Sequence, residues 1–343
     1  MKKTIFSYRT QSTCPICKRK GRLLYNDLTD KLYQVPGKWN FYICTNSKCG
    51  TVWLNPTIIE SEIEYAYKNY HTHEVIEPRL SKFKSLNWLK KRYFDFIKYK
   101  YGFKTNQFKL IFILFNLFLY IHPLKKAFHK KYKFFKPENI DSKLLDIGCG
   151  NGSFLFRMKQ FGWIAEGIDF DKRAIEIALK NNLKVFNSNL RDINYPDDTF
   201  DMIVLDNVFE HIYDLDALFT EVYRIMKPQG RVFINTPNIK SFTHTIFREN
   251  WRGLEPPRHI QILTLESLKT FLANHRFKIE KSFCSVQSNY VTIMSYLLRR
   301  NKKKISTIKK IILNIFVLFY AQLSFIFKNI GDIIVVIGKK DTK

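Results

Sequence analysis

The segment LLDIGCGNGSFL, residues 144–155, most constrains how this chain folds. An apolar run contains Asp146 and is followed at once by Gly148, Gly150 and Gly152. A strand, a bare turn and a helix in succession place backbone N–H groups and a helix N-terminus against a ligand. The spacing is G-x-G-x-G rather than the dinucleotide fingerprint G-x-G-x-x-G, and a neighbouring acid disfavours a pyrophosphate. The segment therefore predicts a cofactor that carries positive charge.

The residues that follow the glycine loop predict the fold class. From 143 to about 285, short apolar runs such as WIAEGIDF and FDMIVLDN alternate with amphipathic runs such as KRAIEIALKNN. This alternation is typical of a parallel sheet with crossover helices. The chain closes with GDIIVVIGKK, which we predict to be the last strand. We therefore expect an α/β fold.

A second acid indicates which cofactor binds. Asp169 ends the run EGID, 21 residues after Gly148, where a carboxylate can accept hydrogen bonds from both ribose hydroxyls. Asp169 could instead cap the helix that follows, but Asp171 can fill that role. S-adenosylmethionine (SAM) has a ribose, whose hydroxyls Asp169 can accept, and an ammonium and a sulfonium, whose positive charges suit a site near Asp146.

Four segments in order, LLDIGCGNGSFL, GIDFD, YPDDTFDMIVLDNVFEHI and RIMKPQGRVFINTPN, resemble the motifs of class I SAM-dependent methyltransferases. Within that class they are similar to the subgroup with ubiquinone-pathway-like and sugar-modifying enzymes. The resemblance implies a Rossmann-like seven-stranded sheet with helices on both faces. It also implies a cofactor site made of a methionine side, a ribose acceptor and an adenine side. Those residues are Asp146, Gly148, Cys149, Gly150, Gly152, Asp206 and Asn207 for methionine, Asp169 for ribose, and Phe170, Asn189 and Leu190 for adenine.

The expected chemistry is methyl transfer to a hydroxyl of a small molecule or glycan. A hydroxyl acceptor benefits from a nearby base, and His211 in FEHI and His259 in EPPRHI both follow predicted strand ends. His211 could instead order its own loop with Glu210. A Glu-His pair could also bind a divalent metal, although the sequence shows no third ligand at helical spacing.

Four cysteines near the start of the chain predict a structural zinc site. Cys14 and Cys17 form one pair, and Cys44 and Cys49 form a second pair 26 residues further on. Four thiolates at this spacing suit tetrahedral zinc, so we predict a zinc ribbon over residues 1–75. Some rRNA guanine methyltransferases also carry such a ribbon. An rRNA methyltransferase, and a non-catalytic zinc-binding scaffold, are therefore the alternative functions.

The charge distribution predicts an acidic partner. The net charge is +27, and residues 79–140 hold sixteen Lys and Arg against Asp95 and Glu138. We expect a basic, aromatic helical segment over 76–140, and a methyltransferase domain over 141–343 with a helical insertion at about 290–330.

Two apolar runs, 110–121 and 311–327, are flanked by lysines. Basic and apolar surface together favour an anionic membrane over nucleic acid. The alternative is that these runs form a helical cap on the core. Phe112, Phe115 and Phe118 are the predicted membrane contacts of the first run. No secretory signal is visible at the start, which predicts a cytoplasmic protein, peripheral at the inner membrane face.

Overall fold

The computed structural model describes residues 6–68, 95, 96, 98, 99, 134–286, 288–327 and 329–341. The chain divides into two compact units, Met1–His71 with Ile193–Lys343, and Thr72–Asp192. Most of the predicted helical segment at 76–140 lies outside the described residues, together with the run 110–121 and its Phe112, Phe115 and Phe118.

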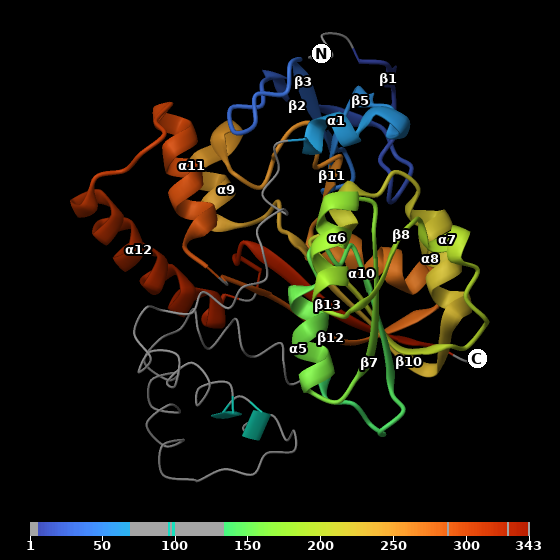
Figure 1. Cartoon of the computed structure of the whole chain (residues 1–343). Coiled ribbons are helices and arrows are strands. Elements are labelled where there is room, and N and C mark those ends of the chain that lie inside the picture. Colours follow the sequence, from blue (N-terminus) through green and yellow to red (C-terminus); the bar gives the residue numbers. More distant parts are fainter. Residues whose placement is uncertain are drawn as a thin grey trace. The chain divides into compact units, whose positions relative to one another are not determined.

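A seven-stranded sheet confirms the predicted α/β fold (Figure 1). Its strand order is β12-β13-β10-β9-β6-β7-β8. Strands β6, β7 and β8 pair in parallel, as do β9 and β10, whereas β13 runs antiparallel to both β10 and β12. The predicted last strand is therefore part of the sheet. The strands are β6 (Lys143–Ile147), β7 (Ile164–Asp169), β8 (Lys184–Asn187), β9 (Phe200–Asp206), β10 (Met226–Pro237), β12 (Phe277–Ser285) and β13 (Ile333–Lys340).

In the unit Thr72–Asp192, helices α5 (Ser153–Gln160) and α6 (Lys172–Lys180) connect the three parallel strands. Asp171 caps α6, because its side chain accepts hydrogen bonds from the backbone N–H groups of Arg173 and Ala174. The cap role therefore belongs to Asp171, which leaves Asp169 at the end of β7. A short helix, α7 (Leu190–Ile193), follows β8.

In the larger unit, helices α8 (Leu215–Ile225) and α10 (Leu265–Asn274) bury aromatic side chains in one cluster. Phe219 packs edge-to-face on Phe209, Phe271 and Phe277 with ring centroids 4.9–6.1 Å apart. Helix α10 begins at a capping box formed by Thr264 and Ser267. The remaining helices of this unit are α1 (Glu64–Tyr67), α9 (Phe242–Phe247), α11 (Tyr290–Arg300) and α12 (Thr307–Ile326).

The N-terminal segment shares a sheet with a strand from much later in the chain. Strands β2 (Gly21–Leu28), β3 (Trp39–Cys44) and β4 (Val52–Leu54) form a meander, and β11 (Gln261–Ile262) pairs with β4. A second small sheet pairs β1 (Tyr8–Arg9) with β5 (Thr57–Ile58). One buried core joins both parts, since Trp39 and Phe41 pack in the same cluster as Trp251. The N-terminal segment is thus continuous with the fold around β11.

Among the described residues, one helix is long and apolar enough to cross a membrane. This is α12, whose window Thr307–Ser324 has a mean hydropathy of 1.3 and is 22% buried. The chain continues from α12 into β13 within a few residues. The predicted helical insertion at 290–330 corresponds to α11 and α12.

Candidate functional site

The glycine loop adopts the backbone conformation that its sequence predicts. Gly148, Gly150 and Gly152 have φ values of 74°, 52° and 80°, in the left-handed region that favours glycine. The N–H groups of Gly148 and Cys149 donate to the carbonyl of Ile168, 2.8 and 3.0 Å away, which holds the loop against β7. A Cβ on Gly150 would meet nothing within 4 Å. The loop therefore presents open backbone on which a ligand can rest.

Asp169 lies beside this loop. One carboxylate oxygen accepts from the N–H of Gly150 at 2.7 Å, and the other accepts from the N–H of Asp171 at 2.8 Å. Each oxygen keeps a second lone pair, so the carboxylate can still accept two ribose hydroxyls. Burial raises the pKa of Asp169, opposed by these backbone hydrogen bonds. A diol that donates to both oxygens would stabilise the ionised form.

The predicted adenine residues surround the ends of β7 and β8. Phe170 is 51% exposed, so its ring lies at the surface, where a purine can stack on it. Leu190 is buried at the start of α7. The Asn189 amide nitrogen donates to Asp192 at 3.4 Å, so its oxygen remains to accept from an adenine amino group. These three residues suit an aminopurine.

The other two predicted residues of this unit are buried. Asp146 is 3% exposed in β6, and Cys149 is 7% exposed within the loop. Burial, followed by the charges of Asp146 and Asp169, raises the pKa of the Cys149 thiol, which is therefore no nucleophile. The open backbone at Gly150, the carboxylate of Asp169 and the exposed ring of Phe170 together fit SAM.

In the other unit, polar side chains gather where β9 and β10 end. The amides of Asn207 and Asn235 both donate to Asp206, at 3.0 and 2.5 Å, and the Asn207 N–H donates to the carbonyl of Asn235. Asn207 is left-handed, with a φ of 59°. The carboxyl ends of strands in α/β sheets are where ligands bind. Both amides line a cavity at these strand ends.

The cavity has a volume of about 300 Å³, within the range of small-molecule sites. Its wall combines the aromatic rings of Trp251 and Tyr290 with the histidines His211 and His259. Carboxylates also reach it, including Asp332, whose pKa burial raises to about 7. The cavity is thus polar and aromatic, and both predicted catalytic histidines line it.

Three side chains of the kinds that bind metal ions lie together at this cavity. Ligand atoms of Glu210, His211 and His259 all lie within 4.8 Å of one another. The ring nitrogen Nδ1 of His211 is 2.9 Å from the Arg258 carbonyl, and that of His259 is 2.7 Å from the Gly253 carbonyl. Because a carbonyl oxygen only accepts, both Nδ1 atoms carry the proton and both Nε2 atoms keep a lone pair.

The charges around His259 favour a cation. Burial lowers the pKa of His259 to about 3 and raises that of Glu210 to about 8. Burial also opposes the ionisation of Glu255, but the charges of Arg252, His259 and Arg258 hold its pKa below the usual range. A Glu255 oxygen lies 3.3 Å from Nε2 of His259. A positive charge stabilises this pair of atoms, whether it is a proton on the His259 ring or a bound cation.

A buried ion network positions Glu255. Arg258 is 1% exposed and donates to Glu255 at 2.9 Å and to Asp30 at 2.9 Å. The same guanidinium lies 4.4 Å from the ring centroid of Tyr33 and donates to the Ala66 carbonyl. Arg252 forms a second ion pair with Glu255. Such a network keeps buried charges paired.

The N-terminal segment thus supplies part of the cavity's support. Asp30, Tyr33 and Ala66 hold Arg258, and the Tyr67 hydroxyl lies 2.9 Å from Nδ1 of His211. The N–H of Leu54 in β4 donates to the carbonyl of Ile260, the residue after His259. The orientation of both histidines therefore depends on residues 30–67.

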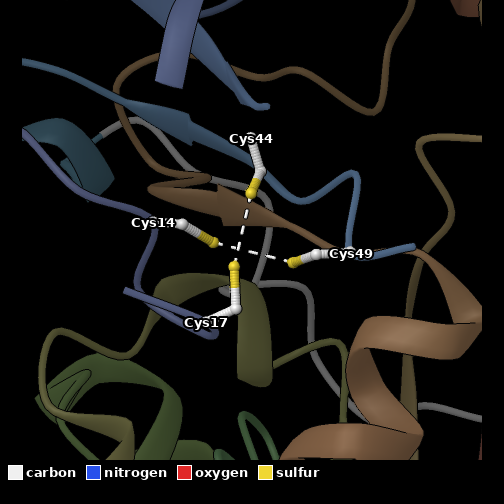
Figure 2. Close-up of side chains that lie close together, drawn as sticks. All are labelled: Cys14, Cys17, Cys44 and Cys49. Carbon is white, nitrogen blue, oxygen red and sulfur yellow. Dashed lines mark hydrogen bonds between the residues drawn. The ribbon is translucent and has the colours of Figure 1, made fainter. Parts of the chain in front are cut away.

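Figure 2 shows the four N-terminal cysteines with their sulfur atoms pointing toward one another. The sulfur atoms of Cys14 and Cys49 are 3.7 Å apart, those of Cys17 and Cys44 are 3.3 Å apart, and all four lie within 4.8 Å. Tetrahedral zinc with Zn–S bonds of about 2.3 Å places sulfurs about 3.8 Å apart. The cluster has the donor set and spacing of a zinc site.

Sequence reasoning missed several residues of the cavity. Glu255, Arg252 and Arg258 lie within the segment WRGLEPPRHI, which sequence reasoning did not single out as a group of paired charges. Asp30 and Tyr67 gave no signal, since each is separated by more than a hundred residues from its partner. The i, i+3 spacing of Arg252, Glu255 and Arg258 was the one available clue.

Comparison with known proteins supports the predicted methyltransferase domain. Residues 120–282 match the family model described as Methyltransferase domain. The chain is 35% identical over 111 residues to a ubiquinone biosynthesis O-methyltransferase of Pelagibacter ubique (strain HTCC1062), covering 30% of this chain and 46% of that protein. It is 36% identical over 99 residues to phosphoethanolamine N-methyltransferase 3 of Arabidopsis thaliana, covering 27% of this chain and 20% of that protein. The chain thus spans less than half the length of these two relatives.

Among solved structures, the chain is similar to a SAM-dependent methyltransferase from Archaeoglobus fulgidus. The TM-score is 0.43 with 22% sequence identity, and the match covers 63% of this chain and 93% of that one.

Proposed function

Because residues 120–282 match the family model described as Methyltransferase domain, we propose that the chain transfers a methyl group from SAM to a hydroxyl of a small molecule or glycan. The observation that carries this proposal is the cavity at the ends of β9 and β10. It combines aromatic walls with hydrogen-bonding groups and convergent histidines. A sulfonium supplies the driving force for the transfer, so the protein must mainly align the acceptor and handle its proton.

Residues of the glycine loop and β7 hold the cofactor in this proposal. Asp169 accepts the ribose hydroxyls, Phe170 stacks on the adenine, and the open backbone at Gly150 faces the methionine part. Asn189 and Leu190 border the adenine. Asp206 and Asn207 are assigned to the methionine side from the family resemblance, and Asn207 also lines the acceptor cavity.

Asp169→Ala is expected to weaken SAM binding by about 1–3 kcal/mol, or about 5- to 150-fold, because two hydroxyls lose their acceptor. Isothermal titration calorimetry measures the dissociation constant directly. Asp171→Ala is the matched control, since it removes the cap of α6 but leaves Asp169 in place. Equal weakening in both variants would remove Asp169 from the ribose site. Absence of SAM binding by the wild-type chain would overturn the proposed activity.

Methyl transfer to a hydroxyl also requires that the hydroxyl lose its proton. His211 and His259 are candidates for a general base, but one ring nitrogen of each also lies within 4.8 Å of the other and of a Glu210 carboxylate oxygen. Two imidazoles and one carboxylate form a donor set that binds Mn²⁺, Fe²⁺ and related ions. We propose that Glu210, His211 and His259 would hold a divalent cation. Such a cation would act as a Lewis acid and lower the pKa of an acceptor hydroxyl in the cavity.

The cavity favours a small acceptor or the terminal group of a larger one. A volume of about 300 Å³ accommodates a sugar ring or a catechol. The decisive experiment measures release of S-adenosylhomocysteine when the chain and SAM are mixed with single acceptors. The panel contains catechols, nucleotide sugars, polyprenyl-linked saccharides and total ribosomal RNA. Turnover with a catechol or saccharide supports the proposal, whereas turnover with RNA alone would establish the rRNA methyltransferase instead.

A further inference from the structure

Helix α12 has two faces of opposite character. Six apolar side chains between 54% and 73% exposed fall on one face, because positions 308, 311, 312, 315, 319 and 326 all point within about 60° of one direction at 100° per residue. These residues, which we name the α12 apolar face, are Ile308, Ile311, Ile312, Ile315, Phe319 and Ile326.

The opposite face attaches α12 to the fold. Val317, Tyr320 and Ala321 are at most 1% exposed. The Tyr320 hydroxyl donates to the carbonyl of Ile330 and lies 3.2 Å from the Asp332 carboxylate, and its ring packs on Phe242. The chain then enters β13, which lies between β12 and β10 in the sheet. These contacts fix α12 along the surface of its unit and would be lost if the helix crossed a bilayer.

Basic residues directly precede the α12 apolar face. Residues 299–310 contain seven Lys and Arg, and no Asp or Glu occurs anywhere in residues 281–331. The side chains of Arg299, Arg300, Lys302, Lys303, Lys304, Lys309 and Lys310 are exposed. Helix α11 ends at Arg300 and α12 begins at Thr307, so three of these cations lie in the turn between the two helices and the other four in the helix ends that flank it (Figure 1).

We infer that the α12 apolar face and the 299–310 basic turn dock the protein on an anionic phospholipid surface, with α12 lying in the plane of the interface. Apolar side chains enter the acyl boundary while lysines and arginines remain at the headgroups, which is how in-plane amphipathic helices bind. Charge decides the occupant. A second copy would bring the same seven cations against these ones, whereas anionic headgroups neutralise them.

Docking of this kind is independent of methyl transfer. It requires only α11, α12 and the turn between them, and none of the cofactor residues lies there. An acceptor that is itself lipid-linked would be delivered to the same surface. Failure of membrane binding would therefore leave the proposed methyltransferase activity standing, and absence of SAM binding would leave the docking surface standing.

The test is sedimentation with phosphatidylcholine vesicles that contain about 30% phosphatidylglycerol, which is enough to give a strongly negative surface. We expect the wild-type chain to sediment with these vesicles and to dissociate in high salt or from pure phosphatidylcholine. Ile312→Ser/Ile315→Ser/Phe319→Ser should weaken binding about tenfold or more. Lys302→Gln/Lys303→Gln/Lys304→Gln should weaken it by a similar factor, but only on anionic vesicles.

A matched control distinguishes docking from general surface hydrophobicity. Ile140→Ser/Phe156→Ser/Leu179→Ser changes three apolar residues that are 42–86% exposed and belong to the unit Thr72–Asp192 rather than to α12. This variant should bind vesicles like the wild type. Phe319→Trp provides a direct readout that does not depend on a loss of vesicle binding. The new tryptophan adds fluorescence, which brominated lipids should quench when this side chain enters the bilayer.

Several results would overturn the inference. They are a wild-type chain that does not sediment, a Phe319→Trp variant whose added fluorescence brominated lipid does not quench, and equal losses in the control and α12 variants. Concentration-dependent self-association abolished by the α12 variant, without vesicle binding, would show that a second copy covers the face. If the wild-type chain does not bind vesicles and the Ile312→Ser/Ile315→Ser/Phe319→Ser variant has a much lower melting temperature, the α12 apolar face is covered by another part of the same chain.

Discussion

A His259→Ala variant is expected to bind Mn²⁺ at least about 100-fold more weakly than the wild-type chain, since loss of a ligand exceeds the 10- to 100-fold effect of losing its supporting partner. The wild-type chain, with its cysteine cluster loaded with zinc, should bind one Mn²⁺ per chain. Electron paramagnetic resonance of free Mn²⁺ measures both affinities without any acceptor. Once an acceptor is identified, the same variant should lose several kcal/mol of transition-state stabilisation, or about 10²- to 10⁴-fold in kcat/KM.

His275→Ala is the matched control for this experiment. His275 is a partly buried histidine at the end of α10, bonded to the Phe271 carbonyl and beside Asp216, and it does not line the cavity. This variant should bind Mn²⁺ normally. If the wild-type chain binds no Mn²⁺ and methylates without added divalent cation, the histidines act as a proton acceptor instead. In that case His211→Ala and His259→Ala should reduce kcat without changing SAM affinity.

Removal of the zinc that we propose for the cysteine cluster is expected to have the second large effect. Cys44→Ser/Cys49→Ser should lose the single zinc that we predict for the wild-type chain, as measured by elemental analysis. Structural zinc contributes about 10–16 kcal/mol in small domains, which is as large as the total stability of most proteins. Residues 6–68 should then unfold, and Mn²⁺ binding should be lost with them, because Asp30 and Tyr67 no longer hold Arg258 and His211.

Cys284→Ala tests whether any cysteine change has this effect. Cys284 is also buried, but it lies in β12 away from the cluster. Zinc content and Mn²⁺ binding should both be unchanged. A zinc-free double variant that keeps Mn²⁺ binding and a wild-type thermal transition would show that the cysteine cluster does not support the cavity.

The glycine loop and the position of Asp169 could be predicted from the sequence, because both depend on residues that are close together in the chain. The positive φ values of Gly148, Gly150 and Gly152 are properties of glycine itself, and Asp169 follows the loop by one βα step. The final strand was also predictable, since GDIIVVIGKK has the composition of a buried strand. The four cysteines reveal their cluster through spacing alone.

The acceptor cavity could not be predicted in the same way. Its metal-type donor set depends on Glu210 and His259 meeting from segments about 50 residues apart, and on carbonyls that orient each imidazole. The pairing of Asp30 with Arg258 spans 228 positions. Such contacts are consequences of the completed tertiary structure, so a single sequence carries no pattern for them. The exposure of the α12 apolar face is likewise a consequence of the completed tertiary structure.

The pairing of β4 with β11 sets an order of events during synthesis. Strand β4 ends at Leu54 and β11 begins at Gln261, so about 200 residues must be translated before β4 meets its partner. At 5–20 residues per second this takes about 10–40 s. Throughout that interval the apolar cluster around Trp39 and Phe41 lacks Trp251, Leu254 and Ile262. The nascent N-terminus therefore has to be protected by metal or by chaperones until the ribosome has delivered the residues of the acceptor cavity.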